Sequence, residues 1–219
     1  MEIANAVNEI YSAAIEIREP FSVLSDDERE QATELLARFE ALEARHGPLP
    51  HRELLRPMLL SKNGRHDDAL RVTELQYRTA PNWESAVAVA NAARRASNLE
   101  LAVVMFAAAA SHDPGDVTCW LEAGDIHLGQ ERFSEALEAY ETALAKEADH
   151  QWALPSAFYC RYQLRLEGNW LASLREVANQ EGCSCGMQGC LTAVFGGYGS
   201  EDGIARAKYL LSKLDGVNA

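Results

Sequence analysis

The chain has 219 residues, of which 47% are hydrophobic and 24% charged, and its formal net charge is −13. This composition is typical of a folded domain or a continuous repeat array and argues against wholesale disorder. The sequence has no apolar run of about eighteen residues, which excludes a membrane span. The negative charge disfavours nonspecific binding to nucleic acid or anionic lipid, and it favours a basic protein partner if electrostatic attraction steers the encounter.

The N-terminal stretch MEIANAVNEIYSAAIEIREP has neither a basic start nor an uninterrupted apolar core, so we do not expect a secretory signal. The chain has five cysteines: Cys119, Cys160, Cys183, Cys185 and Cys190. Because no export signal is expected, these cysteines predict free thiols in a reducing, cytoplasmic compartment rather than a disulfide framework, and their odd number adds weak support.

Residues 1–49 predict a helical hairpin. Apolar residues recur at helical spacing from Ile3 to Ile17, and Pro20 ends this stripe. Ser25 and Glu28 have the spacing of a capping box, which predicts the start of a second helix. Gly47 is expected to end that helix.

The remaining sequence predicts short helices separated by turn residues, and no segment alternates with the period of two that strands require. The turns recur regularly. Pro81 and Pro114 lie 33 residues apart, and Ala148 follows 34 residues later. A helix-turn-helix unit of about 34 residues indicates an all-α repeat solenoid.

Two units, 83–116 and 117–150, carry small and bulky residues at corresponding positions. The unit 117–150 has Trp120 at position 4, Gly124 at 8, Phe133 at 17, Ala136 at 20, Tyr140 at 24 and Ala143 at 27. The unit 83–116 has Ala90 at 8, Ala93 at 11, Leu99 at 17, Ala102 at 20, Phe106 at 24 and Ala109 at 27. This pattern resembles the tetratricopeptide repeat, which implies a right-handed superhelix of helical hairpins.

Small residues at fixed positions allow two antiparallel helices to approach closely. We expect Gly124 to face Ala136, and Ala143 to bring the next unit's first helix equally near. Aromatic residues between them fill the remaining space, each burying about 150–250 Å². Because no unit buries its own hydrophobic face, neighbouring units must stack.

Degenerate units are expected on both sides of this pair, within a single helical domain over 1–219. Residues 50–82 form one, although Pro57 should bend or shorten its first helix. Residues 151–182 form the other, provided that its first helix is about three residues longer than usual. Residues 183–219 predict a C-terminal turn and a capping helix over 203–215.

The resemblance implies that the first helices line a concave groove, with positions 2, 5, 9, 12 and 13 facing a bound chain. Carried over to this sequence, the candidate peptide-binding residues are Glu84, Val87, Asn91, Arg94, Arg95, Thr118, Leu121, Asp125, Leu128, Gly129, Trp152, Tyr159 and Tyr162. Their mixture of amide, basic, aliphatic and aromatic side chains suits an extended peptide or a partner helix. The alternative is a solvated face, with Trp152 or Tyr159 filling the core.

The segment GCSCGMQGC places Cys183, Cys185 and Cys190 close together, which raises the alternative of a metal-binding or redox-sensing site. Its spacing is not that of paired C-x-x-C knuckles, and a fourth ligand, such as Cys160 or His150, would come only from the fold. Small buried thiols at the start of a helix are the competing interpretation. We therefore predict no metal and no cofactor.

No catalytic motif is present. The glycine stretch from Phe195 to Gly203 lacks the Lys-Ser/Thr ending of a P-loop and is expected to connect two helices. His127, at position 11 of its unit, is expected to be a packed core residue. The family variant that clamps the carboxylate tails of chaperones is also excluded, because Val87 and Glu122 replace residues that it requires. The sequence therefore predicts a non-catalytic, chaperone-like adaptor or interaction scaffold that binds another protein.

Overall fold

The computed structural model describes residues 2–17, 24–180, 186–196 and 203–215. These residues form helices α1 (Glu2–Glu16), α2 (Asp26–His46), α3 (Arg52–Lys62), α4 (His66–Thr79), α5 (Trp83–Arg95), α6 (Leu99–His112), α7 (Thr118–Gly129), α8 (Phe133–Leu144), α9 (Ala153–Gln163), α10 (Trp170–Asn179), α11 (Gly186–Gly196) and α12 (Gly203–Asp215). The described residues contain no strand, which confirms the all-α prediction. None of their helices is long and apolar enough to cross a membrane.

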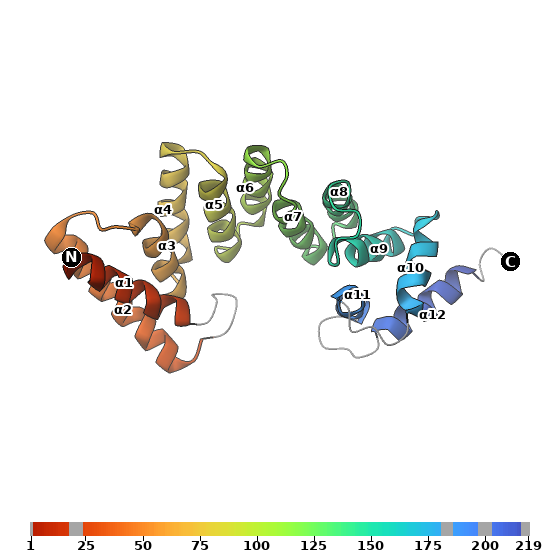
Figure 1. Cartoon of the computed structure of the whole chain (residues 1–219), viewed down its shortest axis with the longest axis horizontal. Coiled ribbons are helices and arrows are strands. Elements are labelled where there is room, and N and C mark those ends of the chain that lie inside the picture. The colour runs from red at the N-terminus through yellow and green to blue at the C-terminus, as the bar shows by residue number, and fades with distance from the viewer. Residues whose placement is uncertain (1, 18–23, 181–185, 197–202, 216–219) are drawn as a thin grey trace. The chain divides into compact units, whose positions relative to one another are not determined.

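The chain divides into two compact units, Met1–Asp113 and Pro114–Ala219. The first unit contains α1–α6 and the second contains α7–α12, and consecutive helices pack together within each unit (Figure 1). The pairs α5–α6 and α7–α8 are the predicted repeats 83–116 and 117–150, which confirms the helical-hairpin fold. A single domain over 1–219 stays a prediction.

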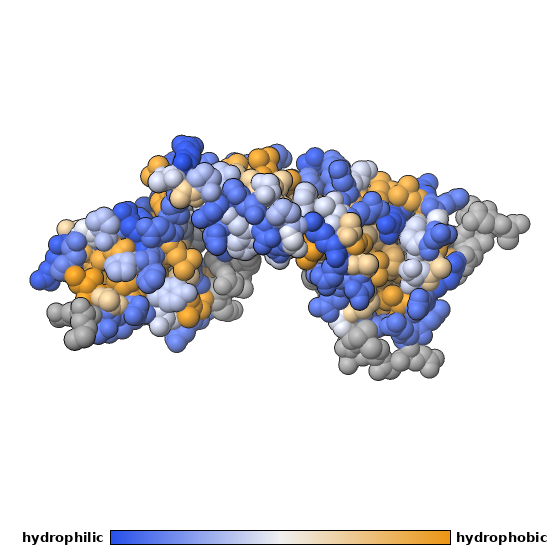
Figure 2. All heavy atoms as spheres, turned by 45° about the horizontal axis from the view of Figure 1, so that its top comes forward, coloured by the Kyte–Doolittle hydropathy of each residue, from blue (hydrophilic) through white to orange (hydrophobic). Residues whose placement is uncertain are grey.

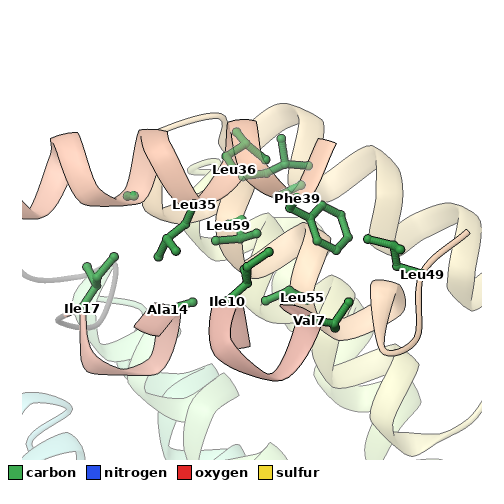
Figure 3. Packing of buried hydrophobic residues seen from close by; sticks show 13 residues of the cluster. Val7, Ile10, Ala14, Ile17, Leu35, Leu36, Phe39, Leu49, Leu55 and Leu59 are labelled. Atoms are coloured by element: carbon green, nitrogen blue, oxygen red, sulfur yellow. The ribbon is translucent and has the colours of Figure 1, made fainter. Parts of the chain in front are cut away.

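The N-terminal hairpin begins its second helix with the predicted capping box. The Glu28 amide donates to Ser25 Oγ at 3.3 Å, and the Ser25 amide donates to Glu28 Oε2 at 2.7 Å. Apolar residues of α1, α2 and α3 converge in one core, where Ile10, Phe39 and Leu59 are fully buried (Figure 3). This core attaches the hairpin to the first helix of the degenerate repeat.

Helix α3 continues through Pro57, although a proline in a helix removes one backbone hydrogen bond. The carbonyl left without its usual donor is that of Glu53, four residues earlier. The Gln76 side chain on α4 donates to this carbonyl oxygen at 3.0 Å. A side chain of the neighbouring helix thus compensates for the hydrogen bond that Pro57 removes.

The close approach of α7 and α8 places the Tyr140 ring beside Gly124, and the predicted contact of Gly124 with Ala136 stays a prediction. A Cβ atom at Gly124 would lie 2.7 Å from Cε1 and 2.9 Å from Cζ of the Tyr140 ring. Glycine is therefore needed to accommodate the aromatic ring of Tyr140. Ala136 and Ala143 are fully buried in the same core, together with residues of α9.

The fourth repeat and the C-terminus also differ from expectation. Helix α9 is not extended; instead, the turn at 164–169 is longer than the corresponding turn at 130–132. The region after residue 185 forms helix α11 where only a turn was expected, and α12 follows as the predicted capping helix. Leu191 and Phe195 of α11 are buried in a core that α9, α10 and α12 complete.

Candidate binding surfaces of the two units

The first unit has a groove between α3, α4 and α5 with a volume of about 820 Å³. It is lined by Arg52, Glu53, Leu54, Arg56, Val72, Leu75, Gln76, Thr79, Ala80, Asn82, Glu84, Ser85 and Ala88. The space-filling view shows hydrophobic side chains in patches between hydrophilic ones (Figure 2). Hydropathy alone therefore does not single out a face, and the groove is distinguished by its shape.

Two large aliphatic side chains of the groove are exposed to water. The exposed fraction is 57% for Leu54 on α3 and 65% for Leu75 on α4. Val72 and Ala88 add apolar surface from α4 and α5. Apolar side chains gathered in a concave site are typical of surfaces that bind another molecule.

The arginines of the groove form ion pairs within the protein, whereas its glutamates form none with the residues that the structure describes. Arg52 and Arg56 both form ion pairs with Glu43, the former with 3.2 Å between Nε and Oε1. Among the described residues, no ion pair involves the carboxylate of Glu53 or Glu84. The carboxylates available to a ligand therefore come from two different helices, α3 and α5.

Of the five predicted groove residues on α5, four lie outside this groove and one, Glu84, lines it. Val87, Asn91, Arg94 and Arg95 are all half-buried, and Arg94 Nη2 donates to Asn91 Oδ1 at 3.3 Å. Besides Glu84, the groove uses Ser85 and Ala88 of α5, which were not predicted. Helix α5 thus has two different surfaces, one that lines this groove and one that carries the other four predicted residues.

In the second unit, Leu121, Asp125 and Leu128 share one face of α7 and are half-buried. Asp125 Oδ1 accepts two hydrogen bonds, from the Tyr140 hydroxyl at 2.6 Å and from Trp152 Nε1 at 2.9 Å. Burial and the adjacent Asp125 raise the pKa of Tyr140. Because a raised pKa keeps the hydroxyl protonated, Tyr140 remains a donor to Asp125.

The two aromatic candidates of the fourth repeat have clear packing roles. Trp152 is half-buried, precedes α9 and links that helix to α7 through Asp125. The Tyr159 ring packs edge-on against Phe133, with 6.2 Å between ring centroids, and against Phe195 at 5.6 Å. Both side chains therefore connect helices, and their contact with a partner stays a prediction.

Comparisons with known proteins agree with this hairpin architecture. A family model described as tetratricopeptide repeat matches residues 93–154, from the end of α5 to the start of α9. Residues 93–154 therefore carry the tetratricopeptide-repeat pattern. A solved structure titled "MamA MSR-1 C2" is 15% identical, with a TM-score of 0.54 over 100% of this chain and 99% of that chain, which shows a shared fold. No curated protein sequence matches the chain.

Tetratricopeptide repeats expose elongated faces of paired helices and serve as protein–protein interaction scaffolds. Leu54 would occupy position 5, one of the predicted groove positions, if Pro50 is position 1 of its repeat. Sequence reasoning missed Leu54 because the groove positions were not carried over to this degenerate repeat. Leu75 lies on the second helix of its repeat, whereas the predicted groove positions all belong to first helices.

Two of the cysteines that the structure describes, Cys160 and Cys190, have a raised pKa, which keeps the thiol protonated. Cys119 and Cys160 are buried, and burial raises the pKa of Cys160 to about 12. Cys190 is half-buried, and its pKa is also raised by burial. Metal ligation needs the thiolate, so these environments disfavour it. In the described part of the chain no three metal-ligating side chains gather, while Cys183 and Cys185 lie outside it.

His127 is a packed residue of α7, as expected, with an exposed fraction of 9%. Its pKa is lowered, first by burial and then by the positive charge of Arg132. Among the described residues its Nδ1 atom has no hydrogen-bond partner. His127 therefore belongs to the core of its repeat rather than to a binding surface.

Proposed function

We propose that this protein is a non-catalytic scaffold, or chaperone-like adaptor, that binds a peptide or helix of a partner protein. The observation that carries the proposal is the groove between α3, α4 and α5, where Leu54 and Leu75 are exposed beside apolar surface of α4 and α5. A partner segment with apolar side chains would cover both leucines. Such burial contributes about 25 cal/mol per Å² of apolar surface removed from water.

The charges of the groove favour a partner segment that also contains a basic residue. Arg52 and Arg56 are already paired with Glu43, whereas Glu53 and Glu84 have no cationic partner among the described residues. A lysine or arginine beside the apolar anchors would satisfy these carboxylates. The chain's net charge of −13 acts in the same direction over longer distances.

The groove proposal is tested by replacing its exposed leucines. The double variant Leu54→Ser and Leu75→Ser should abolish capture of the partner and weaken binding of the isolated partner segment at least about tenfold. Val104→Ser is the matched control, because Val104 is 62% exposed on α6 but does not line the groove. Unchanged affinity in the double variant would contradict the proposal.

The predicted residues on the first helices form the competing surface within the same proposed function. Joint substitution of Asn91, Arg94 and Leu121 tests them, with circular dichroism to verify that the helices persist. Loss of binding only in this variant would assign the partner to that surface instead of the groove. Loss of binding in neither variant would contradict both assignments.

A further inference from the structure

We infer that Asp125 is a receptor for a cationic side chain, lysine or arginine, of a bound partner segment. The inference rests on the proposed function and adds to it a site in the second unit. That site consists of the Asp125 carboxylate and the two leucines, Leu121 and Leu128, on the same face of α7.

The carboxylate of Asp125 is held in a fixed orientation by two neutral donors from other elements. The Tyr140 hydroxyl of α8 and the Trp152 indole both donate to the same oxygen, Oδ1. The Tyr140 ring is itself confined, since it lies in the space that the absent side chain of Gly124 leaves open. A carboxylate positioned in this way needs little reorganisation to receive a ligand.

The second oxygen, Oδ2, remains available. Asp125 has no other hydrogen bond and no ion pair among the described residues, and Oδ2 is not one of their buried unpartnered atoms. This oxygen is therefore not fully buried, on a residue that is half-buried as a whole. The charge of Asp125 is thus uncompensated within the described part of its unit.

A cationic side chain is the ligand that this oxygen favours. Hydrogen bonds between ammonium or guanidinium groups and a carboxylate are about twice as strong as those between neutral groups. Salt also screens partly buried pairs less than exposed ones. Tyr140 and Trp152 supply donors but no positive charge, so a partner's cation would add a charge pair without displacing either hydrogen bond.

The two leucines define the surroundings of this cation. Leu121 lies one turn before Asp125 on α7, and Leu128 lies one turn after it. Both are half-buried and pack against the core of α8 and α9, so each keeps an exposed apolar edge. The site therefore fits a lysine or arginine that is flanked by apolar residues on the partner segment.

The competing explanation is that Asp125 only joins α7 to α8 and to the start of α9. The variant Asp125→Asn separates the two roles, because the amide oxygen still accepts from Tyr140 and Trp152 while the charge is lost. Asp149→Asn is the matched control, since it makes the same chemical change at an exposed position of the same unit. Circular dichroism and thermal melting verify that both variants fold.

The probes are short fluorescent peptides with leucines on both sides of one central residue, which is lysine, arginine or glutamine. The full-length protein should bind the lysine and arginine peptides about tenfold more tightly than the glutamine peptide. Asp125→Asn should remove this preference, and Asp149→Asn should retain it. The preference should also decrease as salt is added.

Two results would overturn the inference while leaving the proposed function in place. One is equal affinity of the wild-type protein for all three peptides. The other is a lysine preference that persists in Asp125→Asn. Binding of none of the peptides would overturn the inference as well, and the leucine variants of the first unit would then decide whether the proposed function survives.

Discussion

The two well-formed repeats, α5–α6 in the first unit and α7–α8 in the second, join their helices in different ways. Three of the corresponding positions at which they differ are Ala90 and Gly124, Asn91 and Asp125, and Phe106 and Tyr140. In α5–α6 the contact is apolar, since Ala90 and Phe106 are both buried and Asn91 interacts along its own helix with Arg94.

In α7–α8, glycine leaves room for the Tyr140 ring, whose hydroxyl reaches Asp125, and Trp152 adds a second donor. The same repeat geometry is thus compatible with an apolar or a polar connection. Only the polar connection leaves a fixed charge at the surface.

The largest expected effect comes from removing the ring in each repeat. Phe106→Ala and Tyr140→Ala should each lower the free energy of unfolding by about 3–5 kcal/mol, because both rings are fully buried. Tyr140→Ala should be the more harmful of the two, because Asp125 also loses a donor. Urea unfolding followed by circular dichroism measures both. A smaller loss at Tyr140 than at Phe106 would show that its hydrogen bond adds nothing.

The second-largest loss of stability is expected when a methyl group is added at Gly124. Gly124→Ala should destabilise by about 1–3 kcal/mol, since the new Cβ would lie 2.7 Å from the Tyr140 ring. The reverse change, Ala90→Gly, should cost only about 0.5–1 kcal/mol. Gly129→Ala is the control, because no heavy atom lies within 4 Å of the added carbon. Thermal melting should leave Gly129→Ala unchanged or more stable; a stabilised Gly124→Ala would refute the proposed close packing.

Removing the Tyr140 hydroxyl should show how much its hydrogen bond to Asp125 contributes to stability. Tyr140→Phe should lower stability by about 1.5 kcal/mol, since it deletes a hydrogen bond to a charged acceptor while keeping the ring. Tyr159→Phe serves as the comparison, because Tyr159 contributes ring packing and no hydrogen bond of its hydroxyl is found among the described residues. Hydrogen exchange should show faster exchange in α7 and α8 only for Tyr140→Phe. Equal exchange in both variants would contradict this assignment.

The smallest expected effect is a pH dependence confined to the α7–α8 repeat. His127 is buried with a lowered pKa, while the corresponding residue of the other repeat is Ala93. As pH falls below 6.5, the ordinary pKa of histidine, the unfolded state binds a proton before the folded state does, so stability decreases toward the folded-state pKa. His127→Gln should reduce this loss of stability in acid. Identical pH profiles of the two proteins would refute it.

Much of the fold could be predicted because its determinants are local. The capping box at Ser25, the turn prolines and the small residues of the two repeats give the helix boundaries of α2 and of α5–α8. Helix α11 could not be predicted in this way, since Gly186, Gly189 and Gly196 disfavour a helix. Its helical state depends on burial of Leu191 and Phe195 against other helices.

The candidate sites were less predictable than the helices. Leu54 and Leu75 belong to different helices, and only their packing with α5 produces a groove. Position 9 of the repeat drew attention to Asp125, whose contact with a partner stays a prediction. Its donors, however, lie 15 and 27 residues later in the chain, so their convergence required the folded structure.

The sequence by itself determined that this chain forms helical hairpins of the tetratricopeptide type, because glycine, alanine, proline and aromatic residues act within one repeat. The tertiary structure decided which side chains remain exposed or unpaired after the hairpins pack. Exposed leucines beside the α3–α4–α5 groove and one open carboxylate oxygen on α7 are properties of that packing, since each depends on neighbours distant in sequence.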